Sequence, residues 1–271
     1  MRERWVLLIA LVPLSAMPAS AQRLWLAPDP GRNVGLEITK GLFKSGSEVD
    51  FASFVVTAEG RFPVSNRLAV TAAIPYSRVS ISDPFLANPP SSAFGNPWVG
   101  IEAMASPDLT VEAGIRPGVS SNEFIDPSAQ EFGVLEDFDR FEAWLPKTTS
   151  LRAMVHAGRI AQRGTFVTGM FGGSVLIPSG GDGTTVYANY GVRVGVRDAH
   201  TLTSLSLTGR VGISHGGVLA GSLNSNVNQV AITVEGVRGT FRPRFSVGSY
   251  VNEGPREFTK AIVTVGASVT M

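Results

Sequence analysis

Three histidines come closest to a catalytic or metal-binding pattern in this chain. His156, His200 and His215 have no second histidine or cysteine at a metal-ligand spacing, so the sequence predicts no metal site. Ser214 and His215 could form a hydrolase pair, but neighbouring residues of a strand point to opposite faces. We therefore expect neither an enzyme nor a protein that binds a cofactor.

Two loops carry weaker chemical signals. The segment 121–149 holds acids that could bind calcium, but it lacks the Asp-x-Asp-x-Asn-Gly pattern, which favours a solvated acidic surface. The segment 178–183, PSGGDG, is rich in glycine like a phosphate-binding loop. It lacks the Lys-Ser/Thr ending and precedes a predicted strand instead of a helix, so an ordinary loop is expected.

Charged side chains recur on one face of segments that alternate polar and apolar residues. In a strand, residues two apart lie on the same face, so a charge at every second position forms a row. We predict that twelve such residues line a lumen: Glu59, Arg61, Glu102, Glu112, Arg116, Arg193, Arg197, Arg210, Glu235, Arg242, Arg244 and Lys260.

The segment Thr184–Ser214 shows which element carries these side chains. Apolar residues occupy every second position from Val186 to Val196, and the alternation resumes from Leu205 after Asp198-Ala199-His200. The pattern predicts two strands of about 12 residues, longer than the usual ~5–6 and long enough to cross a bilayer at a tilt.

The same alternation marks twelve segments along the chain. Tight joins alternate with longer ones at 80–95, 121–149, 215–225 and 252–256. Outer-membrane barrels have short turns on the periplasmic side and longer loops outside. We predict an all-β fold, a single antiparallel up-and-down transmembrane β-barrel of about 12 strands with both chain ends in the periplasm. The predicted strands are about 33–43, 50–62, 67–79, 96–106, 109–120, 150–161, 165–178, 184–197, 201–214, 226–238, 240–251 and 257–270.

The charge distribution favours a membrane barrel over a soluble one. The face opposite the charges is nearly free of charge and consists of Val, Ala, Ile and Leu, with Phe62, Tyr76 and Phe241 near strand ends as in an aromatic girdle. A soluble barrel of this size would enclose more space than small apolar side chains fill at native packing density. The apolar face is therefore predicted to contact lipid.

The first 21 residues read as a secretory signal peptide. Arg2 and Arg4 precede an apolar run, and Ala19-Ser20-Ala21 offers a small-residue cleavage site. Residues 22–271 are expected to form one barrel domain without disulfides, because no linker interrupts them and no cysteine is present. Basic and acidic residues balance after cleavage, which leaves no basic excess to attract nucleic acid.

The longest join, 121–149, differs in composition from the strands. It carries seven acids and several aromatic residues, and Ser128 with Glu131 matches a capping box. A helix that plugs the lumen is one interpretation. A helix packed on the rim and an extra short strand at 140–147 are the alternatives.

Prolines indicate where strands end. Pro75, Pro117 and Pro178 close three predicted strands and are expected at one rim, because proline cannot donate to a ladder. Pro243 lies inside a predicted strand, which indicates either a bulge or a wrong boundary. A tight turn at Arg238-Gly239 predicts Glu235 directly opposite Arg242.

Several motifs resemble a known family. The elements are Ala73-Ile74-Pro75-Tyr76, Gly95-Asn96-Pro97-Trp98-Val99-Gly100 and Leu176-Ile177-Pro178-Ser179-Gly180. They are similar to motifs of the outer-membrane barrels associated with the MetA pathway of phenol degradation, although Asn96-Pro97 stands where that family has Gly-Asp. The final residues also resemble the C-terminal signal of outer-membrane barrels, with Val269 and Met271 in its two aromatic places.

The resemblance implies uptake of small, aromatic compounds. Together with the charged face, it leads us to expect a passive outer-membrane channel for small aromatic or anionic solutes, whose partners are outer-membrane lipid, the barrel assembly machinery and the solute. A non-conducting structural or adhesion barrel is the alternative, followed by a membrane-embedded hydrolase.

Overall fold

The computed structural model describes residues 31–44, 50–82, 90–120, 127–160, 163–180, 183–214, 226–237 and 239–271. Within these residues, antiparallel strands pair in the order β2-β1-β13-β12-β11-β10-β9-β8-β7-β6-β5-β3-β4, and a further pairing of β2 with β3 closes the barrel. The short strand β4 and the strand β5 pair with different parts of the same edge of β3, so together they fill one place in the wall. The wall therefore has twelve strands, as predicted. The predicted signal peptide lies outside the described residues.

The strands are β1 (Asn33–Phe43), β2 (Asp50–Pro63), β3 (Leu68–Ser82), β4 (Ser91–Phe94), β5 (Trp98–Ser106), β6 (Leu109–Arg116), β7 (Thr148–Arg159), β8 (Gly164–Pro178), β9 (Thr185–Arg197), β10 (Thr201–Ser214), β11 (Val227–Gly236), β12 (Phe241–Tyr250) and β13 (Thr259–Thr270). The helices are α1 (Pro127–Glu136), the 3-10 helix η1 (Phe138–Trp144) and α2 (Glu253–Phe258).

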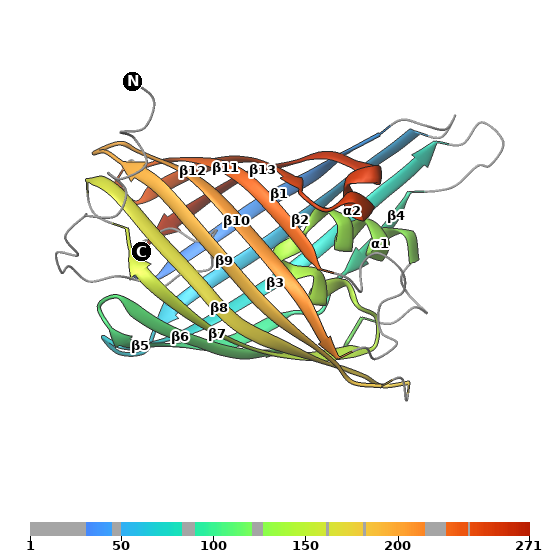
Figure 1. Cartoon of the computed structure of the whole chain (residues 1–271), viewed down its shortest axis with the longest axis horizontal. Coiled ribbons are helices and arrows are strands. Elements are labelled where there is room, and N and C mark those ends of the chain that lie inside the picture. The colour runs from blue at the N-terminus through green and yellow to red at the C-terminus, as the bar shows by residue number, and fades with distance from the viewer. Residues whose placement is uncertain are drawn as a thin grey trace, which may run out of the picture.

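The two ends of the barrel differ (Figure 1). α1, α2 and β4 lie at one end, and β13 finishes at the other. Tight connections such as that between β9 and β10 lie at the same end as the C-terminus. The predicted division into a short-turn end and a long-loop end is therefore confirmed for the described connections, whereas the predicted long join 215–225 lies outside the described residues. The prediction of a plain connection at 252–256 was wrong, because the helix α2 occupies this region.

The hairpin β9–β10 forms as its alternation predicts. Leu202 lies opposite Arg197, and the ladder continues to Ser214 with one irregularity near Gly212. The carboxylate of Asp198 accepts hydrogen bonds from the backbone N–H groups of His200 and Thr201 and from the Thr201 hydroxyl. These bonds, led by that of His200, lower the pKa of Asp198 to about 2 and fix the turn.

The barrel is polar inside and apolar outside. Along β1, Asn33, Glu37 and Thr39 are buried, whereas Leu36 and Ile38 are 49% and 46% exposed. The other strands repeat this inverted pattern, with exposed Val, Leu, Ile and Phe on the outer face. A continuous exposed apolar wall of this kind is stable in lipid, where a closed ladder satisfies every backbone group of the strands.

Pro75 does not end its strand, which corrects the rim prediction. β3 continues to Ser82. The partner strand is interrupted instead, because Gly95, Asn96 and Pro97 separate β4 from β5 opposite Pro75. Gly95 still donates its N–H to the carbonyl of Pro75 at 3.0 Å. Pro117 and Pro178 lie at strand ends as predicted.

Pro243 lies within β12, at the point where pairing with one neighbour stops. The ladder to β11 ends at Glu235–Arg244, one residue before Pro243, while the ladder to β13 continues through it. A proline is tolerated here because the pairing with β11 has already ended.

In the described part of the chain, no helix is long and apolar enough to span a membrane.

Candidate functional site

Most of the predicted lumen residues are buried inside the barrel. Arg197 and Arg244 are partly buried. Lys260 differs from the expectation and is exposed, at the start of β13 where a register shift against β1 disturbs the alternation. The buried residues are Glu59, Arg61, Glu102, Glu112, Arg116, Arg193, Arg210, Glu235 and Arg242.

Arginine and glutamate favour different sides of the lumen. The strands β9 to β12 carry five arginines and one glutamate, whereas β1, β2, β5 and β6 contribute four glutamates and two arginines. The first group is Arg193, Arg197, Arg210, Arg242, Arg244 and Glu235, and the second is Glu37, Glu59, Glu102, Glu112, Arg61 and Arg116. The lumen therefore has a basic side and a mainly acidic side.

One buried ion pair neutralises part of this charge, and a histidine contacts another of the acids. Arg61 donates from Nε and Nη2 to Glu102, with a closest distance of 3.1 Å across the intervening strand β3. Nε2 of His156 lies 3.4 Å from the carboxylate of Glu112. Such pairs hold the side chains in place, although their desolvation offsets much of the Coulombic attraction.

The predicted register of Glu235 was wrong. β11 ends at Gly236 and β12 begins at Phe241, a longer connection than the two-residue turn that was expected. Glu235 therefore lies opposite Arg244 in the ladder. Its carboxylate is 3.9 Å from Arg242, and Arg244 forms an ion pair with Glu37 on β1.

The segment 127–145, which we call the plug, folds into the barrel. Phe141 and Trp144 are 2% and 1% exposed and cluster with Val55, Leu176 and Tyr187 of the wall. This position supports the plug interpretation, and η1 occupies the region where an extra strand was the alternative. α1 begins at Pro127, so the predicted N-cap Ser128 is inside the helix. Proline suits this first position because its missing N–H needs no partner there.

Arg140 connects the plug to two strands. Its guanidinium forms ion pairs with Asp137 at 2.9 Å, with Glu37 of β1 at 2.8 Å and with Glu59 of β2 at 3.5 Å. Burial alone would lower the pKa of Arg140, but these three carboxylates raise it above its ordinary value. Arg140 is therefore the positive centre of a buried acidic cluster.

Polar contacts fix the plug at two further places. Asn96, at the break between β4 and β5, donates to the carbonyl of Leu145 at 2.8 Å and accepts from Ser120. The Glu136 carboxylate accepts from the Gly41 N–H at 2.8 Å and from the Ser53 hydroxyl at 2.5 Å. The plug is thereby held to β1, β2 and the β4–β5 break.

An aromatic and cationic contact joins the plug to the basic side. The Arg210 guanidinium lies 3.7 Å from the centre of the Phe141 ring, and Phe141 meets Tyr187 edge to face. Glu142 accepts a hydrogen bond from Ser174 at 2.7 Å. These contacts add β8, β9 and β10 to the strands that hold the plug.

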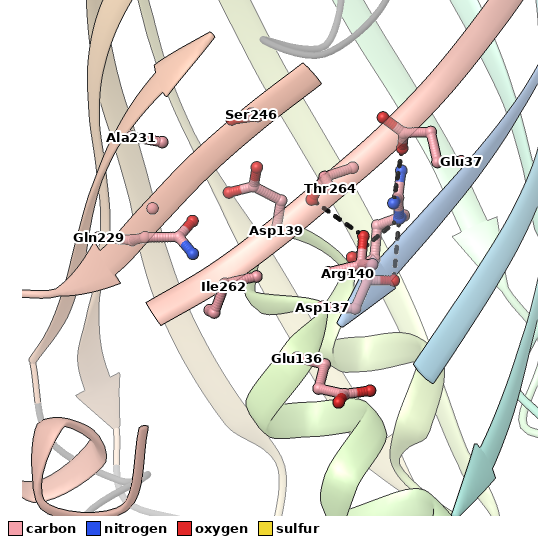
Figure 2. A pocket seen from close by; sticks show the side chains of 12 residues that line it. Glu37, Glu136, Asp137, Asp139, Arg140, Gln229, Ala231, Ser246, Ile262 and Thr264 are labelled. Atoms are coloured by element: carbon pink, nitrogen blue, oxygen red, sulfur yellow. Dashed lines mark hydrogen bonds and ion pairs between the residues drawn. The ribbon is translucent and has the colours of Figure 1, made fainter. Parts of the chain in front are cut away.

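A small polar cavity remains between the plug and the wall (Figure 2). Its volume is about 30 Å³, which is room for one or two water molecules. It is lined by Glu37, Thr39, Glu136, Asp137, Asp139, Arg140, Gln229, Ala231, Ser246, Gly248, Ile262 and Thr264. Among the described residues, no three His, Asp or Glu side chains converge as metal ligands.

The residues that fix the plug were not predicted from the sequence. Glu37 lies on the polar face of its predicted strand, so the alternation could have identified it. Arg140 and Glu136 carried no such signal, because their partners lie on distant strands. Asn96 was noted only as a departure from a family motif.

No protein-family model matches the sequence, and no curated protein matches it. The COG4313 outer membrane channel from Pseudomonas putida F1 has a similar structure, with a TM-score of 0.58 at 11% identity over 96% of this chain and 98% of that channel. The fold is that of bacterial outer-membrane barrels. The translocator domain of the autotransporter NalP from Neisseria meningitidis gives a TM-score of 0.57 at 8% identity over 90% of this chain and 89% of that domain. LpxR from Salmonella typhimurium gives a TM-score of 0.54 at 10% identity over 88% of this chain and 100% of LpxR. At these identities the likeness concerns the fold alone.

Proposed function

We propose that the protein is a narrow passive channel for small solutes, in which the plug forms the constriction. The observation that carries the proposal is the charged lumen of a closed barrel, divided by a plug that is held to opposite sides of the wall. A lumen lined by Arg and Glu side chains selects solutes by size and charge. A twelve-stranded barrel is intermediate between small filled barrels and wide porins.

The solute class is part of the proposal. The basic strands β9 to β12 favour anions, and the motif resemblance to the MetA-pathway barrels favours small aromatic compounds. We place both chain ends in the periplasm, by analogy with the short-turn end of other barrels. Export through residues 1–21 and insertion by the barrel assembly machinery complete this proposal.

A non-conducting barrel is the second candidate, and the small size of the cavity favours it. The cavity between the plug and β11–β13 has a volume of about 30 Å³, which is too small for an organic solute. Passage of such a solute through this cavity requires the plug to shift relative to the wall. The hydrolase alternative gains little support, since the Ser214 hydroxyl accepts a hydrogen bond from the Val186 N–H and His215 lies outside the described residues.

Single-channel recording in planar bilayers tests the proposal. We expect a small, steady conductance from the wild type and a larger one from Asn96→Ala, because this change removes the hydrogen bonds that hold the end of the plug. Asn66→Ala, at an exposed position on the β2–β3 connection, is the matched control and should resemble the wild type. If correctly folded wild type and Asn96→Ala both pass no current, the barrel is non-conducting.

A further inference from the structure

Two polar groups point into the cavity without a partner. The carboxylate of Asp139 makes no hydrogen bond or ion pair to any residue in the described part of the chain; only its backbone carbonyl is engaged, by Arg152 at 3.1 Å. The Gln229 side chain on β11 is 6% exposed and likewise lacks a hydrogen-bond partner among those residues. Figure 2 shows both groups directed into the space between η1 and the wall.

The charges around this space do not balance. Glu37 and Asp137 are paired with Arg140, and Glu37 also with Arg244. Asp139 and Glu136 line the same cavity, yet neither forms an ion pair within the described structure. Glu136 is buried and Asp139 is partly buried. A carboxylate in such a place without a direct ion pair is costly, and a bound cation would remove part of that cost.

The lining suits a small cation with one positive charge. Beyond the carboxylates it offers the Gln229 amide and the hydroxyls of Thr39, Ser246 and Thr264, with Thr39 and Thr264 already 3.1 Å apart. These oxygen atoms can accept hydrogen bonds from an ammonium group or coordinate an alkali ion. A multivalent metal is not indicated, since no three acidic or histidine ligands converge among the described residues.

We propose that the cavity between the plug and β11–β13 is a binding site for a small monovalent cation, either an alkali ion or a primary ammonium group. Asp139 supplies the charge, and Gln229 and the threonines supply neutral ligands. The site lies where the plug meets the wall, so an occupied site would stabilise the docked plug. The proposal does not depend on whether the barrel conducts.

The pKa of Asp139 agrees with a carboxylate that forms no direct ion pair. Burial is the main cause that raises it to about 7, Asp137 and Glu37 add to the rise, and Arg140 and Arg152 oppose it. From the other packed elements, Glu136 of α1 shares the cavity and Arg210 of β10 interacts with Asp139. A proton and a cation would therefore compete for this carboxylate, and cation binding should strengthen above pH 7.

Thermal unfolding of the purified full chain in detergent at pH 8 tests the site. Potassium, ammonium and methylammonium chlorides are compared with tetramethylammonium chloride at equal ionic strength. Tetramethylammonium is too large for the cavity and has no N–H donor. We expect at least one of the small cations to raise the unfolding temperature by about 2–4 °C over tetramethylammonium, with potassium and ammonium distinguishing the two kinds of ligand.

Two variants make the test specific. Asp139→Asn should abolish the cation-dependent rise, and Gln229→Leu should reduce it. Glu253→Gln, an exposed acid on α2, should retain the full rise. The proposal is overturned if the wild type responds equally to all four salts, which would mean that the cavity holds water only, or if Asp139→Asn retains the rise.

Discussion

At the scale of single residues, the fold depends on where charge is buried. Arg140 carries one positive charge among three carboxylates, whereas Asp139 has none against it within hydrogen-bonding distance in the described residues. The first arrangement stabilises ionised acids, and the second favours a protonated one. Asp137 and Asp139, only two positions apart, thus lie in opposite electrostatic surroundings: Asp137 is paired with an arginine and Asp139 is not.

The replacement Asp139→Asn should stabilise the protein only at higher pH. The unfolded carboxyl loses its proton near its ordinary pKa of 3.8, whereas the folded one retains it to about pH 7. Between these values the folded state binds more protons, so its stability falls as pH rises. Without added small cations, the gain from Asn should grow from pH 4 to pH 7 and then level off, on the order of 2–4 kcal/mol.

Unfolding temperatures of Asp139→Asn and wild type, measured from pH 4 to pH 9 in tetramethylammonium buffers, check this expectation. Glu253→Gln serves as the control and should follow the wild type. A difference that is constant across the range would show that Asp139 does not titrate near pH 7.

The assignment of the two faces predicts an asymmetry between neighbouring residues of β9. Val194 is 41% exposed on the outer face, and Arg193 is 4% exposed inside. Val194→Arg places a charge toward lipid at a cost of up to ~2–4 kcal/mol near the midplane. Arg193→Val removes a hydrogen bond to Ser204 and a contact with Phe166, each of which contributes less.

Refolding yields into lipid vesicles should therefore fall more for Val194→Arg than for Arg193→Val. The shift of the folded band on unheated gels gives the yield. The opposite ranking would mean that the faces are inverted.

At the scale of elements, the alternation of polar and apolar residues predicted the strands. It did not predict how the plug contacts the wall. β1 and β10 have the predicted boundaries, because each residue of these strands faces either the lumen or the outside. The break at Asn96 and the continuation of β3 past Pro75 could not be predicted, since both depend on the plug contact at that point. Loop 121–149 offered a helical pattern but no indication of which wall it contacts.

Arg140→Leu should release the plug from the wall. The change leaves Glu37, Glu59 and Asp137 without their shared counter-charge, and breaking a buried pair in this way costs about 3–5 kcal/mol. We expect faster proteolytic cleavage within residues 127–147 and a larger conductance. The effect should be weaker at low pH, where the freed carboxyls can protonate.

Arg256→Leu removes an exposed arginine from α2 and is the control. Limited proteolysis of both variants in detergent makes the comparison. Equal cleavage rates would show that the Arg140 cluster does not hold the plug.

At the scale of the whole molecule, the barrel is polar inside and apolar outside, the reverse of a soluble protein. Its lumen has an uneven electrostatic field, with a basic side and a mainly acidic side. The charged positions followed from the alternation, but their pairing did not. Glu235 meets Arg244 in the ladder because the β11–β12 connection is longer than its Arg-Gly sequence indicated. Pairing across an intervening strand, such as Arg244 of β12 with Glu37 of β1 across β13, depends on barrel closure and leaves no trace in one strand's sequence.

This field predicts the direction of ion selectivity. Arg242→Gln removes positive charge from the basic side and should lower the preference for anions, whereas Glu235→Gln should raise it. Reversal potentials in a potassium chloride gradient measure both. Identical selectivity in the two variants would show that these side chains do not face the conducting path.

If the apolar face contacts lipid while the charged face encloses the lumen, neighbouring residues of one strand must differ in their contact with lipid. The sequence contains no cysteine, so single cysteines can be labelled without background. The measurement is quenching by brominated lipid of a fluorophore placed in turn at four consecutive positions of β10, where Leu205 and Leu207 are exposed and Ser204 and Ser206 are buried. Strong quenching is expected at 205 and 207, and weak quenching at 204 and 206. Equal quenching at all four, or the opposite alternation, would contradict it.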